Sequence, residues 1–363
     1  MFANDNRVVL TLDAGGTNFV FTAIQGLKPI GTPVTLPSNA DNLDKCLSNI
    51  VEGFKTLKSS IDAEPVAISF AFPGPADYPN GIIGDLGNLP AFRRGVALGP
   101  MLQEIFGIPV FINNDGDLFA YGEAIAGLLP QVNEELIKAN SPRQFHNLLG
   151  VTLGTGFGAG FVCNGQLFIG DNSAGAEIWL TRSLLHPLCF AEEGVSIRAI
   201  QREYARQTNE NSEHLTPKDI FDIAEGTKEG DPMAARFAFE RLGLELGNAL
   251  ANAITLLDCL VVVGGGLSNA WKYIAPAVLA QLNGTLSSVS SATVDRLEIK
   301  AFNLDDSEQM AKFTKGNAQT VKVPMSSKTV TYDPLKRTGI GLSRLGTDRK
   351  STRLNSSHSV TSR

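Results

Sequence analysis

The sequence has few of the residues that mark secreted or membrane-spanning proteins. The four cysteines in 363 residues are Cys46, Cys163, Cys189 and Cys259. They show no CxxC spacing, so no disulfide framework is indicated and we expect reduced thiols in the cytoplasm. No apolar run reaches the roughly 18–20 residues that a membrane helix needs, because Asn252 and Asp258 interrupt the most apolar stretch. The first residues lack the charged-then-apolar pattern of an export leader.

A strong positive charge is also missing. The net charge is −6 and no basic cluster stands out in the body of the chain, which argues against a nucleic-acid partner. Hydrophobic residues make up 43% of the chain and charged residues 19%, as in ordinary globular proteins. With 363 residues the chain is long enough for two domains with full cores.

A glycine-containing segment, Leu12-Asp13-Ala14-Gly15-Gly16-Thr17-Asn18, follows the short β-branched run 8–12. The run 19–24 after it also has the composition of a strand, so the glycines are predicted to turn a hairpin. A plain tight turn explains the glycines by their freedom to adopt positive φ. A phosphate-binding loop explains them as well, since bare backbone N–H groups can approach an anion while Asp13 faces a metal ion.

Strand and helix patterns alternate along the chain, which predicts an α/β fold. We expect strands over 66–72, 110–112, 148–153 and 260–263. Helical spacing of apolar residues predicts helices over 39–59, 98–106, 116–129, 234–257 and 269–282. A break near residues 115–130 would divide the chain into a smaller and a larger lobe.

Two further glycine loops stand at predicted strand ends. Leu153-Gly154-Thr155-Gly156-Phe157-Gly158-Ala159-Gly160 nearly matches the dinucleotide pattern GxGxx(G/A), but a strand and not the required helix follows it. Gly264-Gly265-Gly266 ends a strand and precedes a helical segment. Tight packing is a sufficient explanation for any one loop. A nucleoside triphosphate held between two lobes explains all three together.

The ordered set of motifs "LDAGGTN", "FPGPADYPNGIIGDLGNLP", "GIPVFINNDGDLFAYGE", "LGTGFGAGFVCNGQLFIGDNSAGAEI" and "LVVVGGGLS" resembles that of ROK-family sugar kinases in the actin-like ATPase superfamily. The resemblance runs from about residue 7 to about residue 349. It implies a two-lobe, ribonuclease H-like fold, with a mixed sheet flanked by helices in each lobe and ATP and sugar meeting in the cleft. It also implies an ATP-dependent kinase that phosphorylates a hexose, glucose-like or an N-acetylhexosamine. We further expect a homodimer.

Asp115 is the candidate general base. Phosphoryl transfer to a sugar hydroxyl needs a group that accepts the hydroxyl proton, and Asp115 ends a predicted strand inside "NND". An ordinary N-cap for the following helix is the alternative role, and the two roles can coexist. By the resemblance, Asn114 and Asn88 would bond sugar hydroxyls, although Asn88 is also an ordinary turn residue.

The resemblance assigns the remaining site residues to nucleotide and sugar. Asp13 would hold Mg²⁺ through water, and loop residues from both lobes would contact ATP. The predicted ATP-binding residues are Asp13, Gly15, Gly16, Thr17, Gly154, Thr155, Gly156, Gly265 and Gly266. Glu177 corresponds to a substrate-binding glutamate, and the second such glutamate falls on Glu192, with a one-residue ambiguity toward Glu193.

One segment departs from the family pattern. Members continue after "EI" with Gly-His and a cysteine cluster that binds structural zinc, whereas this chain has Trp179 and Leu180 there and only Cys189 nearby. One thiolate, even with His186, cannot complete the four-ligand site that zinc prefers, so we expect no structural zinc. Leu180 also cannot hydrogen-bond a sugar, which leaves the sugar preference open.

We predict three segments: a small lobe over 1–115, a large lobe over 116–350, and a tail over 351–363. The tail has five serines in thirteen residues and no helical stripe, so it reads as disordered or non-native, with a native flexible tail as the alternative. Only twelve residues precede Asp13, too few for the helix-turn-helix segment of a ROK repressor. A non-catalytic sugar-binding protein remains the alternative to a kinase.

Overall fold

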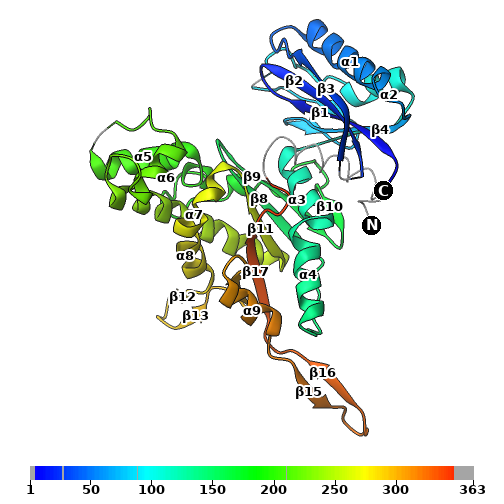
Figure 1. Cartoon of the computed structure of the whole chain (residues 1–363). Coiled ribbons are helices and arrows are strands. Elements are labelled where there is room, and N and C mark those ends of the chain that lie inside the picture. Colours follow the sequence, from blue (N-terminus) through cyan, green and yellow to red (C-terminus); the bar gives the residue numbers. More distant parts are fainter. Residues whose placement is uncertain (1–4, 27, 88, 210, 347–363) are drawn as a thin grey trace. The chain divides into compact units, whose positions relative to one another are not determined.

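The computed structural model of the protein describes residues 5–26, 28–87, 89–209 and 211–346. Two compact units are present (Figure 1), and each is described by itself. The first comprises the described residues within Met1–Ala126, Gln166–Gly175 and Leu345–Arg363, and the second those within Gly127–Gly165 and Ala176–Arg344. Asn88 and the tail 351–363 lie outside the described residues. The predicted small lobe over 1–115 stays a prediction, although by packing the helix after residue 115 groups with the first unit.

The first unit is built on a five-stranded mixed sheet with the order β3-β2-β1-β4-β7. The central strand β1 pairs antiparallel with β2 and parallel with β4. The first-unit elements are β1 (Val8–Ala14), β2 (Asn18–Gln25), β3 (Lys28–Pro37), α1 (Leu43–Ser59), β4 (Pro65–Ala71), β5 (Ala76–Asp77), β6 (Ile82–Ile83), α2 (Leu98–Phe106), β7 (Val110–Asn113), α3 (Asp115–Ile125) and β10 (Gln166–Phe168).

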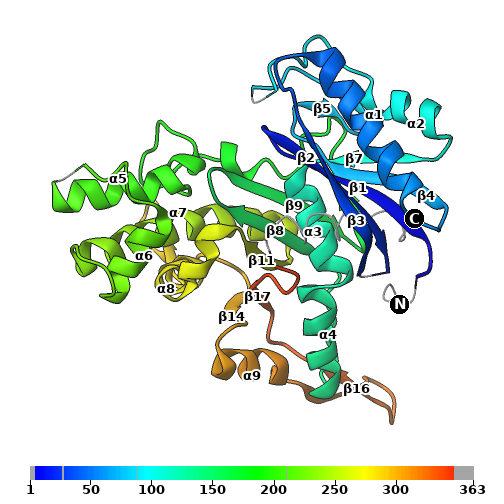
Figure 2. The ribbon, with the colours of Figure 1, turned by 45° about the horizontal axis from the view of Figure 1, so that its top comes forward.

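The helices α1 and α2 pack on the same face of this sheet (Figure 2). Alternate residues of β1 point to opposite faces, so Val8, Leu10 and Leu12 join the helices in one core while Val9 faces the other side. The helix α1 begins at the N-cap Asn42, whose side chain accepts a hydrogen bond from the Lys45 N–H at 3.0 Å.

The second unit is built on a mixed sheet whose strands within that unit have the order β9-β8-β11-β17-β14. It repeats the plan of the first sheet, because β8 pairs antiparallel with β9 and parallel with β11. The second-unit elements are α4 (Leu128–Lys138), β8 (Leu148–Leu153), β9 (Phe157–Cys163), η2 (Ile178–Leu180), η3 (Ala191–Glu193), α5 (Ile197–Thr208), α6 (Pro217–Glu225), α7 (Pro232–Leu257), β11 (Leu260–Gly264), η4 (Gly266–Ala270), α8 (Trp271–Leu282), β12 (Thr285–Ser287), β13 (Thr293–Asp295), β14 (Lys300–Asn303), α9 (Ser307–Lys315), β15 (Gln319–Lys322), β16 (Thr329–Tyr332) and β17 (Arg337–Leu342).

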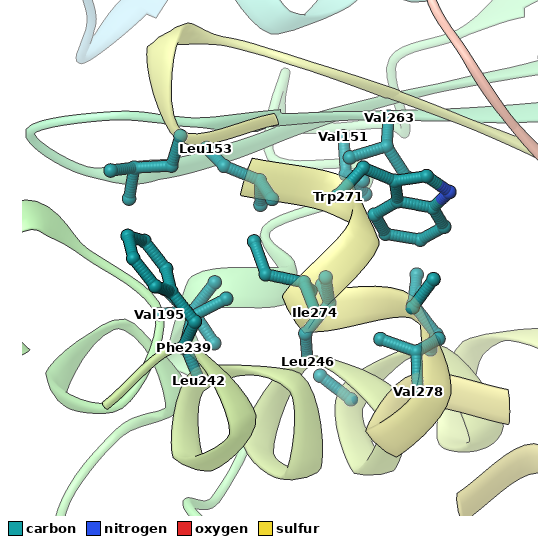
Figure 3. Packing of buried hydrophobic residues seen from close by; sticks show 14 of the residues in the cluster. Val151, Leu153, Val195, Phe239, Leu242, Leu246, Val263, Trp271, Ile274 and Val278 are labelled. Carbon is teal, nitrogen blue, oxygen red and sulfur yellow. The ribbon is translucent and has the colours of Figure 1, made fainter. Parts of the chain in front are cut away.

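The long helix α7 and its neighbour α8 form the main apolar layer under this sheet. Figure 3 shows Val151 and Val263 of the strands above Leu246 of α7 and Ile274 of α8. The two helices approach closely because α7 carries glycine at the contact: a Cβ on Gly243 would lie 2.6 Å from the Ile274 carbonyl oxygen.

Most predicted elements are confirmed, and one is wrong. The predicted helix over 116–129 is two helices, α3 and α4, which break at Ala126 and Gly127. The first ends at Ala126, whose N–H bonds the Gly122 carbonyl, and the second begins only at Leu128. None of the helices in the described part of the chain combines the length and apolar character needed to cross a bilayer.

A two-stranded ribbon, β15–β16, extends from the second unit (Figure 1). A buried ion pair directly after β16 stabilises the base of this ribbon. The Arg337 guanidinium donates to the Asp333 carboxylate at 2.6 Å, and both side chains are almost completely buried. The same carboxylate accepts the backbone N–H groups of Asn317 and Leu335 at 3.1 and 3.0 Å. Burial raises the pKa of Asp333, but the Arg337 guanidinium and the two N–H donors outweigh this effect, and the pKa lies below its usual value.

We expect Asp333→Asn to lower the free energy of unfolding by roughly 3–5 kcal/mol, because the substitution keeps the size of the side chain but leaves the Arg337 charge buried and uncompensated. Urea titration followed by circular dichroism measures the change. Glu298→Gln, which removes the exposed partner of Lys336, is the matched control and should leave the free energy of unfolding unchanged within error.

The pair also predicts a pH effect. Because the folded pKa of Asp333 is depressed, its stabilisation is present above the unfolded pKa near 3.8 and is lost as the pH falls through the folded pKa. The Asp333→Asn protein should therefore lose less stability than the wild type between neutral pH and pH 3. Equal losses in the two proteins would contradict the assignment.

Candidate functional site

The first glycine loop is the tight connection of the β1–β2 hairpin, as predicted. The Gly15 N–H donates to the Asn18 carbonyl at 3.1 Å, and the Ser38 hydroxyl donates to the Gly16 carbonyl at 2.5 Å. Gly16 and Thr17 are exposed, and a Cβ on Gly16 would meet nothing within 4 Å. The hydrogen bond from Ser38 thus stabilises the loop, and the exposed surface at Gly16 and Thr17 is accessible to a ligand.

The parallel strands of the first unit bring Asp13 and Asp115 to one edge of the sheet. In register, Asp13 of β1 lies opposite Ala71 of β4, and Ala71 lies opposite Asn113 of β7. Asn114 and Asp115 follow β7 directly. This edge is the carboxyl end of the parallel strands, where open α/β sheets bind ligands.

Asn114, not Asp115, caps α3. The Asn114 Oδ1 accepts the Gly116 N–H at 2.8 Å, and Asp115 is the first helical residue. The Asp115 Oδ1 also accepts the Gly116 N–H at 2.8 Å, and the residue is exposed. The N-cap interpretation of Asp115 is therefore wrong, and the carboxylate stands at the positive end of the helix dipole. The hydrogen bond to Gly116 occupies the Asn114 Oδ1. The Nδ2 amide group therefore remains as the donor to a ligand.

The second glycine loop joins β8 to β9, so a strand and not a helix follows it, and the dinucleotide-binding interpretation is excluded as expected. The loop is closed by a hydrogen bond from the Gly154 N–H to the Gly156 carbonyl at 3.0 Å. Thr155 lies exposed at its tip. A Cβ on Gly154 would meet nothing within 4 Å, which leaves the backbone approachable.

The third loop lies against the second. Because β8 and β11 are parallel neighbours, with Thr152 opposite Gly264, their loops emerge at the same edge. Gly265 has a φ of 87°, and a Cβ there would lie 2.2 Å from the Leu153 carbonyl oxygen. Only glycine fits this crossing. Gly266, by contrast, has open space beside it.

A largely apolar pocket of about 320 Å³ opens beside Gly266. Its walls come from α6, α7 and η4, and they include Phe221, Phe239 and Leu267, with Lys218 and Asp222 also in the lining. The sequence prediction missed the α6 and α7 residues, since nothing in their local pattern separates them from ordinary core positions. A flat aromatic ligand fits such a pocket better than a sugar does.

Glu192 is bound to the second glycine loop. Its Oε2 accepts the Phe157 N–H at 2.9 Å, and its Oε1 accepts from Arg198 at 2.8 Å. Glu193 pairs with Arg198 and Arg202 at 2.9 and 3.1 Å. Burial raises the pKa of Glu193, but the two guanidinium groups outweigh it and hold the pKa below its usual value. Glu192 is therefore the one of the two that contacts a predicted phosphate loop.

Glu177 is exposed and precedes η2. The indole N–H of Trp179 donates to the Glu177 Oε2, and the indole ring packs edge-on against Phe190 with centroids 5.6 Å apart. Leu180 points outward with 58% of its surface exposed. Trp179 thus orients the carboxylate that the sequence singled out.

The segment that replaces the zinc-binding cluster is held by hydrogen bonds. The Cys189 N–H donates to the His186 carbonyl at 2.7 Å, and the Cys189 residue is exposed. Across the described ranges, no group of three or more His, Cys, Asp or Glu side chains is arranged to hold a metal ion. The expectation of no structural zinc stays a prediction.

Comparisons with known proteins identify the family. The ROK family model matches residues 9–310. The N-acetyl-D-glucosamine kinase of Vibrio parahaemolyticus is 30% identical over 279 residues, which cover 71% of this chain and 83% of the relative. The glucokinase of Thermotoga maritima is 26% identical over 318 residues, covering 79% and 93%. The crystal structure of a glucokinase from Parabacteroides distasonis matches with a TM-score of 0.94 and 53% identity, covering 100% of this chain and 99% of that one.

The chain belongs to the ROK family. Its fold is the predicted α/β fold of actin-like ATPases, with a mixed sheet flanked by helices in each of two units. The resemblance that the motifs indicated is thereby confirmed.

Gly265 and Gly266 provide a matched pair of substitutions. We expect Gly265→Ala to lower the free energy of unfolding by about 2–3 kcal/mol, because both the positive φ and the contact with Leu153 resist a Cβ. Gly266→Ala should change it by less than about 1 kcal/mol, since its Cβ meets open space. Thermal unfolding followed by circular dichroism distinguishes the two, and equal stabilities would contradict the close crossing.

Elemental analysis tests the zinc prediction. We expect less than about one tenth of a zinc ion per purified chain, because Cys189 and His186 supply too few ligands for a tetrahedral site. A value near one zinc per chain would overturn it.

Proposed function

We propose that this protein transfers the γ-phosphoryl group of ATP to a hydroxyl of a hexose or an N-acetylhexosamine. Its relatives are named glucokinase and N-acetyl-D-glucosamine kinase, which are sugar kinases, and the 53% identity to one glucokinase extends over the whole chain. The observation that carries the mechanism is the strand register that aligns Asp13 with Asn113, two residues before Asp115.

Asp115 accepts the hydroxyl proton in this proposal. An exposed carboxylate at the start of a helix is accessible to substrate, and its hydrogen bond from the Gly116 N–H holds one oxygen while the other remains for a hydroxyl. Asn114, which uses its Oδ1 as the helix cap, offers amide N–H groups to sugar oxygens. Asn88 is proposed as a further sugar contact on the family resemblance alone.

ATP is proposed to bind through the glycine loops. Gly16 and Thr17 of the first unit, and Thr155 and Gly156 of the second, offer backbone N–H groups to phosphate oxygens, whereas Gly15 and Gly154, whose N–H groups bond within their own loops, line the site without donating. Gly266 lines the pocket beside η4, whose aromatic walls suit the adenine ring, and Gly265 directly precedes Gly266 in the chain. These roles follow from exposed backbone at the loops and from the chemistry of the pocket.

Asp13 fits a magnesium site of the usual phosphate-bound kind. Mg²⁺ prefers oxygen ligands and takes one or two carboxylates together with water and phosphate, so a single strand-end aspartate is sufficient. When bound, the ion would neutralise charge on the transferred phosphoryl group. Asp13 would hold it through water.

The sugar is proposed to contact Glu177 and Glu192. Trp179 holds the first carboxylate, and the second connects the sugar segment to the phosphate loop through Phe157. Carboxylates are strong acceptors for sugar hydroxyls.

We also propose a cytoplasmic location, because the four cysteines are unpaired. A homodimer is proposed on the family resemblance. Assays with ATP against glucose, N-acetylglucosamine, N-acetylmannosamine, mannose and fructose identify the preferred sugar.

Asp115→Asn tests the mechanism. We expect kcat with the best sugar to fall at least about a hundredfold, because asparagine keeps the size of the side chain but cannot accept the proton. Sugar affinity from calorimetry should change by less than about threefold, since the amide still bonds a hydroxyl.

The matched control is Asp44→Asn, which removes an exposed carboxylate from the first turn of α1. It should leave kcat unchanged and lower stability by only about 0.3–1 kcal/mol. Near-normal kcat in Asp115→Asn would remove Asp115 from the mechanism. A wild type that binds a sugar but phosphorylates none of the panel would favour the non-catalytic sugar-binding alternative.

A further inference from the structure

Glu245 is a carboxylate that the proposed mechanism does not use, and it is completely buried. It lies on α7 between Leu242 and Leu246, both members of the apolar core. Burying a carboxylate is unfavourable unless hydrogen bonds replace its water. Its partners therefore reveal why the helix carries a charge at this position.

Among the residues that the structure describes, the hydrogen bonds of Glu245 come from one loop. The Leu184 N–H donates to Oε1 at 2.7 Å, and the Ser183 hydroxyl and the Leu185 N–H donate to Oε2 at 2.8 and 3.0 Å. Ser183 in turn accepts the His186 N–H at 2.9 Å. No ion pair of Glu245 occurs within the described ranges. The carboxylate and the loop over 183–186 thus depend on each other.

The backbone just after the loop also contacts Glu245. A Cβ on Gly194 would lie 2.5 Å from the Glu245 Cγ, so the backbone after η3 passes directly over the stem of the side chain. The loop is closed at its base. The Ala191 N–H donates to the Thr181 carbonyl at 2.8 Å, and the backbones of Arg182 and Phe190 pair as an isolated antiparallel β-bridge.

This loop connects the two glutamates proposed to contact sugar. Glu177 and Trp179 precede its base, and Glu192 follows directly after it. Phe190, on the loop, is the residue against which the Trp179 indole packs. A shift of the loop would therefore move the supports of both carboxylates.

We infer that Glu245 is a positioning residue of the sugar site: its buried carboxylate holds the loop over 181–190 so that Glu177 and Glu192 are presented together to the substrate. The predicted change in enzyme kinetics rests on the proposed function. The structural coupling of Glu245 to Trp179 is independent of the proposed function.

Glu245→Gln is the informative substitution. Glutamine has nearly the same volume, but only one of its terminal atoms accepts hydrogen bonds, whereas the loop presents three donors divided between both oxygens. At least one N–H or O–H is left facing an NH₂ group. The local geometry is therefore disturbed without opening a cavity.

We expect KM for the best sugar to rise about tenfold or more in Glu245→Gln, while KM for ATP and kcat change by less than about threefold, because binding groups and not the proton acceptor are displaced. Ser183→Ala, which removes one donor, should also raise KM for the sugar, by a smaller factor. Glu240→Gln on an exposed position of α7 is the matched control and should leave all constants unchanged.

Acrylamide quenching of tryptophan fluorescence gives a readout that does not require activity. The chain has two tryptophans, of which Trp271 is buried and Trp179 is partly exposed. Quenching should increase in Glu245→Gln and stay at the wild-type level in Glu240→Gln, with thermal unfolding verifying that both remain folded. For a variant that does not fold, Ser183→Ala serves in its place.

Unchanged quenching together with an unchanged sugar KM would overturn the inference. A fall in kcat with unchanged sugar KM would also overturn it, since it would point to a general structural role. If the wild type phosphorylates no sugar, the proposed function fails, and the quenching comparison alone decides whether Glu245 holds the loop.

Discussion

Parallel pairing at the centre of each sheet is the constraint on which the rest of this structure depends. In the first unit β1 pairs parallel with β4 and β4 with β7, and in the second unit β8 pairs parallel with β11. Parallel strands end at the same edge, so the segments that follow them gather there whatever their distance in sequence. Asp13 and Asp115 become neighbours of one edge in this way. So do the loops at Gly154 and Gly265, where the contact with Leu153 admits only glycine.

Two buried carboxylates stabilise irregular segments that lie outside the two large sheets. Asp333 binds Arg337 and two backbone N–H groups at the root of the β15–β16 ribbon. Glu245 binds the loop over 183–186 through hydrogen bonds from one hydroxyl and two backbone N–H groups. In each case one acidic side chain satisfies several donors of an irregular segment, which has no ladder of its own. The two differ in charge balance, since Asp333 has an arginine partner and Glu245 relies on oriented N–H and O–H groups.

The sugar segment shows how a family site is retained while its surroundings change. Trp179 and Leu180 occupy positions where the family pattern has Gly-His, and the cysteine cluster is reduced to Cys189. Trp179 nevertheless bonds Glu177, and Phe190 supports the indole. Glu192 reaches back to the phosphate loop through the Phe157 N–H. Membership in the ROK family and the identity to named sugar kinases are thus compatible with a locally different support for the substrate residues.

The local pattern of the sequence determined the elements, the hairpin turns and the order of the glycine loops. Short-range rules suffice for these: alternation for β1, apolar spacing for α1, and the absence of a helix after Gly160. The sequence also determined the family, because five motifs occur in a specific order. It did not determine the break at Ala126 and Gly127, which continuous apolar spacing conceals. It assigned a possible cap to Asp115, whereas the tertiary structure gives that role to Asn114 through a single hydrogen bond.

Only the tertiary structure decided which distant residues act together. Glu245 lies about 60 positions from the loop that it binds, and nothing in the helical pattern of α7 distinguishes it from an interrupted apolar stripe. Phe221 and Phe239 join Gly266 around one pocket for the same reason. Periodicity in a sequence reports which side of an element is buried, but the partner on that side is chosen by chain topology and packing. Residue types and local elements therefore follow from the sequence, whereas the grouping of side chains into sites follows from the fold.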